Sequence, residues 1–216
     1  MKKLLLLIFG FFAIGYSQEN LDAELLLNKV SDNIKSYENI YINYAYTLQN
    51  LEEDISQTNK GSFVTENDNW RFEMLGVTRI FDGDKLYSIS PDDDEVTISS
   101  QDPEDETTIT PNKMLYFYED GYYFEMDESR LIGNGQFRKK IQYVKLVPKD
   151  SEAEIKYIPL GIDTEFNQIY EVIETGKNET VTTISIVDFE FNLPLDANLF
   201  VFDKEKYKDY YMNILD

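Results

Sequence analysis

The chain has 216 residues, with 41 acidic and 20 basic side chains, no histidine and no cysteine. A formal net charge of -21 argues against a nucleic-acid-binding protein, because such a protein needs a basic surface to neutralise phosphates. The absence of histidine and cysteine excludes a Ser-His-Asp triad, a Cys-His pair, and zinc sites built on imidazole or thiolate. Any catalysis would have to use carboxylate, tyrosine, lysine or serine groups, or a hard cation bound by oxygen atoms.

Residues 1–17 have the pattern of a secretory signal peptide. Lys2 and Lys3 form a basic start, residues 4–14 are apolar, and Ser17 supplies the small residue that precedes cleavage. The apolar run is too short for an ordinary transmembrane helix. We therefore expect an exported, soluble protein whose mature chain, residues 18–216, forms one domain. Because no cysteine follows the apolar run, we expect no lipid anchor.

An amphipathic helix is predicted over residues 21–36. Leu26 and Val30 lie at the centre of its expected apolar face, at helical spacing. From Ile40 the hydrophobic period changes to two, which predicts a strand over residues 40–49. Aromatic residues make up 14% of the chain, and this enrichment also favours strands.

Short strand patterns continue to the end of the chain. They cover residues 61–65, 70–74, 77–81, 85–90, 96–99, 122–126, 137–147, 154–162, 168–175, 180–189 and 199–202. Turn residues separate them, as at Asp82-Gly83 and at Pro91 to Asp94. Two further helices are predicted, over residues 112–118 and 204–215. This arrangement predicts a mainly β protein, either a sandwich or a barrel.

The sequence offers little support for an enzyme. With 41 acidic residues, a carboxylate pair suitable for glycan hydrolysis is always available, so its presence carries almost no information. The densest acidic run, Asp92 to Glu95, lacks the alternating spacing of a calcium loop and is interpreted as a solvated turn. We expect no catalytic residue, metal site or cofactor, and keep a carboxylate-based glycan hydrolase as an alternative hypothesis.

The aromatic strands suggest a binding function instead. Their apolar faces are buried either by two packed sheets or by one curved sheet around a cavity. A cavity of this kind would suit acyl chains, whose burial contributes about 0.8 kcal/mol per CH2 group. Ordinary core packing is the alternative interpretation of the same residues. The strand residues concerned are Ile42, Tyr44, Tyr46, Trp70, Phe72 and Met74.

Several segments, taken in order, resemble the periplasmic outer-membrane lipoprotein carrier family of the LolA type. The similarity includes the helix over residues 21–36 with the aromatic strand after it, and the hairpin from Phe81 to Pro91, which is similar to the family pattern DGxxLWxYxP. It continues through residues 61–64, 70–73, 110–115, 144–149 and 184–188. Residues 195–202 resemble the closing D-x-x-x-F-x-F pattern, so the resemblance covers nearly the whole mature chain.

The resemblance implies a single curved antiparallel sheet of about 11 strands that forms an incomplete barrel with a helical lid. It implies a monomeric, non-catalytic carrier that binds acylated lipoproteins in a hydrophobic cavity in the periplasm. An inner-membrane ABC transporter would supply the cargo and an outer-membrane acceptor would receive it. Besides the strand residues, the implied cavity includes the lid residues Met114, Leu115 and Tyr118.

The chain departs from the family in one place and leaves one alternative open. Family members commonly carry Arg-Pro before the third strand, where the arginine helps to latch the lid, but residues 65–68 contain no arginine. Arg71 and Arg79 are nearby in sequence. The alternative function is an envelope lipid-binding or stress-sensing protein of the same architecture with a different amphiphilic ligand.

Overall fold

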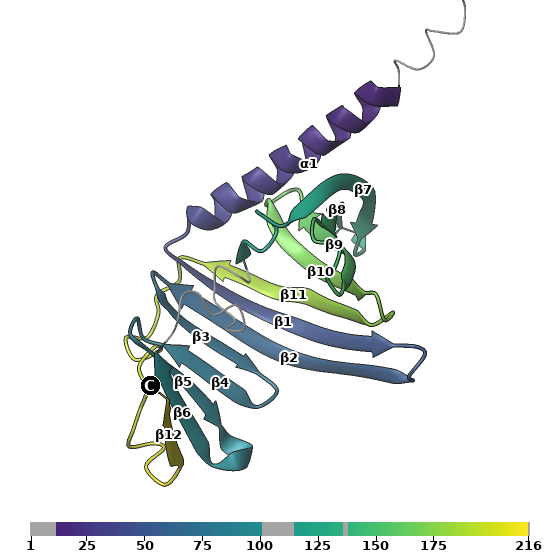
Figure 1. The fold of residues 1–216 in the computed structure, drawn as a ribbon. Coiled ribbons are helices and arrows are strands. Elements are labelled where there is room, and N and C mark those ends of the chain that lie inside the picture. The colour runs from purple at the N-terminus through teal and green to yellow at the C-terminus, as the bar shows by residue number, and fades with distance from the viewer. Residues whose placement is uncertain (1–11, 101–114, 136–137, 216) are drawn as a thin grey trace, which may run out of the picture. The chain divides into compact units, whose positions relative to one another are not determined.

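A computed structural model describes residues 12–100, 115–135 and 138–215, and it divides the chain into two compact units. The first unit comprises residues 1–35, 49–55 and 116–183, and the second comprises residues 36–48, 56–115 and 184–216. Backbone hydrogen bonds join twelve strands in the order β12-β6-β5-β4-β3-β2-β1-β11-β10-β9-β8-β7 (Figure 1). The order is that of an open sheet, because β12 and β7 stand at its opposite ends.

The first unit contains one helix and four antiparallel strands. Its elements are α1 (Phe12–Lys35), β7 (Tyr122–Ile132), β8 (Lys139–Pro148), β9 (Ile155–Asp163) and β10 (Gln168–Gly176). Helix α1 lies against β7 and β10. Its buried side chains, Ala23, Leu27, Val30 and Ile34, follow one another at intervals of four, three and four residues, as one helical face requires.

The second unit is built on an antiparallel meander. Its elements are β1 (Asn39–Asn50), β2 (Ile55–Glu66), β3 (Asn69–Met74), β4 (Val77–Phe81), β5 (Lys85–Ser90), the 3-10 turn η1 (Pro91–Asp93), β6 (Glu95–Ser100), most of β11 (Val181–Phe191), and β12 (Tyr211–Leu215). Strands β2 to β5 each pair antiparallel with the next strand along the chain. Strand β12 pairs with β6 in parallel.

The predicted helix is present, but its bounds and its buried face differ from the prediction. Helix α1 begins at Phe12, nine residues before the predicted start, and runs through the predicted cleavage position near Ser17. Cleavage there stays a prediction. Val30 is buried as predicted, but Leu25 is 50% exposed while Leu27 is 4% exposed, so the buried face is rotated toward Leu27. Within the described residues, no helix is long and apolar enough to cross a membrane.

The short strands of the meander are confirmed, including the predicted hairpin between β4 and β5. The Asp82 carboxylate accepts hydrogen bonds from the backbone N–H groups of Asp84 (3.0 Å) and Lys85 (2.8 Å). Gly83 has a φ of +94°, which a residue with a side chain rarely adopts. Turn chemistry therefore fixes this hairpin as the sequence predicts. Of the predicted helix over residues 112–118, residues 112–114 lie outside the described residues, and residues 116–118 form a bend and a turn.

The predictions for the C-terminal segment are wrong. A strand over residues 199–202 and a helix over residues 204–215 were expected, but residues 196–210 form turns and irregular chain, and Tyr211–Leu215 forms β12. The Asp203 carboxylate accepts hydrogen bonds from the N–H groups of Glu205 (3.0 Å) and Lys206 (3.1 Å), which closes a turn where the helix was expected. Tyr210 and Tyr211 also fit a helical spacing, and tertiary pairing with β6 decides against it.

Candidate functional site

Six of the predicted site residues lie on β1 and β3 of the second unit: Ile42, Tyr44, Tyr46, Trp70, Phe72 and Met74. Side chains alternate between the two faces of a strand, so the three residues of each strand share a face. Ile42, Tyr44, Trp70 and Phe72 are buried, at 2–6% exposure, whereas Tyr46 and Met74 are half-buried.

Tyr44 on β1 contacts Phe72 on β3. Their rings stack with centroids 6.1 Å apart and an interplanar angle of 22°. The Tyr44 hydroxyl donates a hydrogen bond to the backbone carbonyl of Glu73 (3.3 Å). To reach β3, the ring crosses β2 at Gly61, where an added Cβ would lie 2.3 Å from the hydroxyl oxygen. Burial raises the pKa of Tyr44, so this hydroxyl stays protonated as a donor.

The strand register extends this surface over β2 and β4. Phe72 lies opposite Phe63 on β2, and Trp70 lies opposite Phe81 on β4, with ring centroids 6.1 Å apart. Directly opposed residues share a face of the sheet. We define the aromatic face by these side chains: Tyr44, Phe63, Trp70, Phe72 and Phe81. The predicted strand residues of the site are therefore brought together, and Phe63 and Phe81 join them through a register that the sequence does not reveal.

The opposite face of the same strands is covered by the chain's own C-terminal segment. Val64, Ile80, Ile89 and Val96 form a hydrophobic cluster there with Phe200. Tyr87 stacks on Phe202 at 4.6 Å between ring centroids. The segment from Leu195 to Met212 supplies the outer layer of this cluster. The C-terminal segment thus covers one face of the meander, and the aromatic face lies on the other side of the same strands.

The predicted lid residues are not brought to the aromatic face as a group. Met114 lies outside the described residues, and Leu115 is buried in the second unit at 5% exposure. Tyr118 belongs to the first unit, where it is fully buried and its hydroxyl lies 3.0 Å from Ser31 Oγ of α1. Burial raises the pKa of Tyr118 to about 12, although the hydrogen bond with Ser31 lowers it. The role of these residues as a lid stays a prediction.

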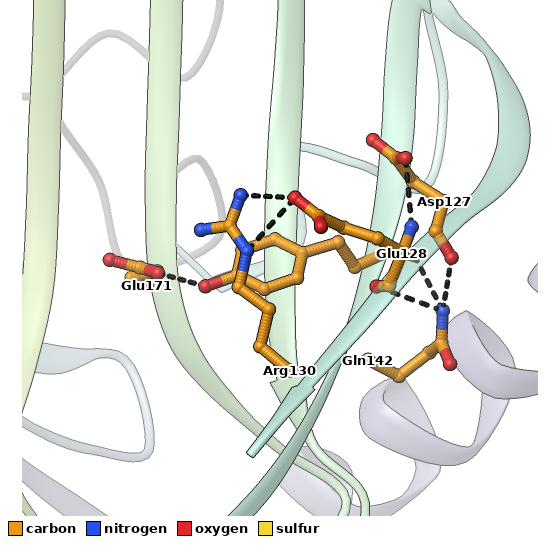
Figure 2. Close-up of polar contacts among 6 residues, drawn as sticks. Asp127, Glu128, Arg130, Gln142 and Glu171 are labelled. Carbon is orange, nitrogen blue, oxygen red and sulfur yellow. Dashed lines mark hydrogen bonds and ion pairs between the residues drawn. The ribbon is translucent and has the colours of Figure 1, made fainter. Parts of the chain in front are cut away.

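A polar cluster in the first unit was not anticipated from the sequence (Figure 2). The hydroxyl of buried Tyr143 donates to Glu171, and the Arg130 guanidinium lies 4.5 Å from the Tyr143 ring centroid and pairs with Glu128. Gly161 lies beneath the ring, since an added Cβ would be 3.0 Å from Tyr143 Cε1. Tyr143 thus reaches from β8 across β9 to β10, as Tyr44 reaches across β2.

The phenol of Tyr143 is a hydrogen-bond donor in this polar cluster. Burial, followed by the hydrogen bond to Glu171, raises the pKa of Tyr143, so the phenol remains a neutral donor. Within the described ranges, no group of three His, Cys, Asp or Glu side chains is arranged to hold a metal ion. The aromatic face differs from this cluster in being apolar, and none of its five side chains is charged.

No family model matches the sequence, and no curated protein matches it. An uncharacterized conserved protein from Thermus thermophilus has a similar structure, with a TM-score of 0.55, 12% identity, and coverage of 90% of this chain and 99% of that chain. A putative outer membrane lipoprotein-sorting protein domain from Vibrio parahaemolyticus matches with a TM-score of 0.44, 12% identity, and coverage of 86% and 99%. A LolA superfamily protein from Nitrosomonas europaea matches with a TM-score of 0.42, 10% identity, and coverage of 84% and 98%.

At this level of identity the likeness concerns the fold alone. The Thermus protein has the same overall arrangement over nearly its whole length. The predicted mainly β fold is confirmed, with twelve strands in one open order against the expected 11, and one helix in the part of the chain that the structure describes.

Proposed function

We propose that the protein is a non-catalytic periplasmic carrier that binds the acyl chains of lipoproteins on the aromatic face. The gathering of Tyr44, Trp70 and Phe72 on one side of the sheet is the observation that supports this most. Aromatic rings offer a large apolar surface to a flexible chain. With about 0.8 kcal/mol for each CH2 group, a dozen buried groups would contribute about 10 kcal/mol before the entropic costs of binding.

The burial of the aromatic face suits a carrier that must also release its cargo. Trp70 and Phe72 are 2% and 6% exposed, so an acyl chain reaches them only by replacing contacts that they already make. The net binding free energy is then the difference between the apolar contacts that the acyl chain makes and those that it replaces. This difference is smaller than the free energy of transferring the chain from water to an apolar environment. An acceptor with a better apolar site can withdraw such a cargo without any chemical step.

The charge of the protein and its N-terminal pattern support the location and the partners in this proposal. A signal peptide over residues 1–17 would export the chain to the periplasm. An inner-membrane ABC transporter would load the carrier, and an outer-membrane acceptor would unload it. A net charge of -21 favours basic docking surfaces on both partners and disfavours adhesion to anionic lipid.

A pair of half-buried tyrosines on opposite faces allows a matched test in cells. Tyr46 follows Tyr44 on the same side of β1, whereas Tyr87 on β5 belongs to the face covered by the C-terminal segment. Replacing each in turn by the photoreactive residue p-benzoyl-phenylalanine, followed by irradiation and mass spectrometry, identifies what lies against each face. We expect acylated lipoprotein to be crosslinked at position 46 and not at position 87. Adducts with free lipid alone at position 46 would contradict the lipoprotein cargo, and no acyl adduct there would contradict the carrier function.

A further inference from the structure

Two arginines on adjacent strands lie on opposite faces of the meander. Arg71 on β3 is directly opposite Ile80, which belongs to the hydrophobic cluster under the C-terminal segment. Arg79 on β4 is directly opposite Phe72, so it lies on the same side as the aromatic face. Both side chains are half-buried, and they differ in what surrounds them.

A carboxylate balances the charge of Arg71, whereas none of the described carboxylates pairs with Arg79. Arg71 Nη2 lies 2.5 Å from Glu73 Oε1, and its Nε donates to the same oxygen at 2.9 Å. Among the described residues, no carboxylate lies within ion-pair distance of Arg79. A guanidinium cannot lose its charge near neutral pH, and its five N–H groups need acceptors when water is partly excluded. Arg79 is therefore suited to an anionic ligand group.

The register places Arg79 where the face changes from apolar to polar. A row of directly opposed residues crosses β2, β3, β4, β5, β6 and β12 in the order Phe63, Phe72, Arg79, Ser88, Thr97 and Asn213. Two aromatic residues lie on one side of Arg79, and hydroxyl and amide groups lie on the other. Neighbouring strands are about 4.8 Å apart, so the distance from Arg79 to Phe63 along the row is about 10 Å.

One acidic residue shares this side of the sheet at its polar end. Glu95 lies on β6, two strands away from Arg79 and offset along the strand. Its Oε1 already accepts hydrogen bonds from Thr97 Oγ1 (3.1 Å) and Asn213 Nδ2 (3.2 Å). Glu95 thus fixes the polar end of the row, and Arg79 is the basic residue within the row.

We propose that Arg79 binds the anionic head group of an amphiphile, a carboxylate or a phosphate, while its acyl chain lies over Phe72 and Phe63. This inference rests on the proposed function, because it concerns the same aromatic face. The acyl chains of a lipoprotein are attached by neutral ester and amide bonds, so in that cargo the anionic group is a carboxylate of the polypeptide beside the acylated residue. The guanidinium donates charge-assisted hydrogen bonds to the head group, and Ser88 on the adjacent strand offers a further donor. An amphiphile with a neutral head leaves the charge of Arg79 without a partner. The site therefore selects acyl ligands by charge.

The test compares ligands that differ only in the head group. Binding of hexadecanoate, hexadecyl phosphate and hexadecanol to the purified protein is measured by isothermal titration calorimetry below the micelle concentration. The variants are Arg79→Gln, Arg79→Lys and, as the matched control on the opposite face, Arg71→Gln. Circular dichroism of each variant verifies folding. We expect the wild type to bind the anionic ligands about 10-fold more tightly than hexadecanol, as hydrogen bonds to a charged group imply.

The variants then separate the possible results. In Arg79→Gln the ratio of the affinity for the anionic ligands to that for hexadecanol should fall to about one, while the affinity for hexadecanol stays unchanged. Arg79→Lys and Arg71→Gln should keep most of the wild-type ratio. A preference for either anion that depends on Arg79 supports the proposal, and comparing the two tells carboxylate from phosphate. Equal binding of all three ligands by the wild type, or a preference that survives in Arg79→Gln, overturns it and leaves the carrier function standing. A wild type that binds none of the three overturns both.

Discussion

Replacing Gly61 by alanine tests whether the aromatic face depends on a tyrosine that crosses a neighbouring strand. An added Cβ at this position would lie 2.3 Å from Tyr44 Oη, 2.4 Å from Tyr44 Cζ and 2.6 Å from the backbone oxygen of Glu73. None of these distances is compatible with van der Waals contact. The carbonyl belongs to a strand that is paired on both sides, so the tyrosine ring has to give way first.

The cost of Gly61→Ala follows from what Tyr44 would lose. Moving the ring breaks its hydrogen bond to Glu73, which contributes about 1 kcal/mol. It also breaks the stacking with Phe72, which contributes about 1 kcal/mol. Residual crowding against the Glu73 carbonyl adds about 1 kcal/mol. We therefore expect the free energy of unfolding to fall by about 3 kcal/mol, and the melting temperature by roughly 6–12 °C for a chain of this size.

Trp70 provides the assay, because it is the only tryptophan of the chain and is 2% exposed within the aromatic face. Urea denaturation followed by its fluorescence should show a lower midpoint for Gly61→Ala. In a Tyr44→Ala background the same substitution should cost at least about 1 kcal/mol less, since the ring is already absent. The corresponding Gly161→Ala variant should be milder, because its closest contact is 3.0 Å. An unchanged midpoint for Gly61→Ala, or equal costs in both backgrounds, would refute the reasoning.

Three further predictions address the helix, the C-terminal segment and the ligand. Tyr118→Phe should lower the unfolding free energy near neutral pH by about 1 kcal/mol through the lost Ser31 hydrogen bond. Because the pKa of Tyr118 is raised in the folded state, the unfolding free energy of the wild type should decrease as pH rises from about 10 to about 12. Denaturation measured across that range should show a smaller decrease in the variant, which lacks the hydroxyl. Phe202→Ala should cost about 3 kcal/mol by removing the ring that stacks on Tyr87, and an unchanged thermal midpoint would contradict that packing. Titration with hexadecanoate should shift the emission of Trp70, and a silent Trp70 at saturating ligand would separate the aromatic face from the binding site.

Local sequence signals account for most of the meander. Strands β4 and β5 have the predicted bounds, because the Asp82-Gly83 turn between them is specified by its own side chain and by a positive φ. Period-two alternation was enough to place Trp70 and Phe72 on one face of β3. Wherever turn chemistry and alternation agree, the sequence determines both the element and its face.

The crossings of strands by tyrosine rings could not be predicted, because they depend on register. Tyr44 faces Gly61, and Tyr143 faces Gly161, only after the strands have paired. In the sequence, each glycine reads as a position that weakens a strand or marks a bulge. In the structure, each provides the space through which a tyrosine reaches the second strand away. The same holds for Arg79, whose position opposite Phe72 appears only in the β3–β4 register.

The C-terminal segment shows why helical spacing alone misled the prediction for residues 204–215. Tyr207 and Tyr210 are three residues apart, which suits one face of a helix, but their rings also contact each other edge-on at 5.2 Å in a turn. Tyr207 stacks on Phe202 at 5.7 Å, so the aromatic residues pack as a layer on the sheet. A short aromatic sequence carries no information on which surface it will cover, since that surface is assembled from strands distant in the chain. The C-terminal segment therefore buries one face of the meander with its own aromatic residues.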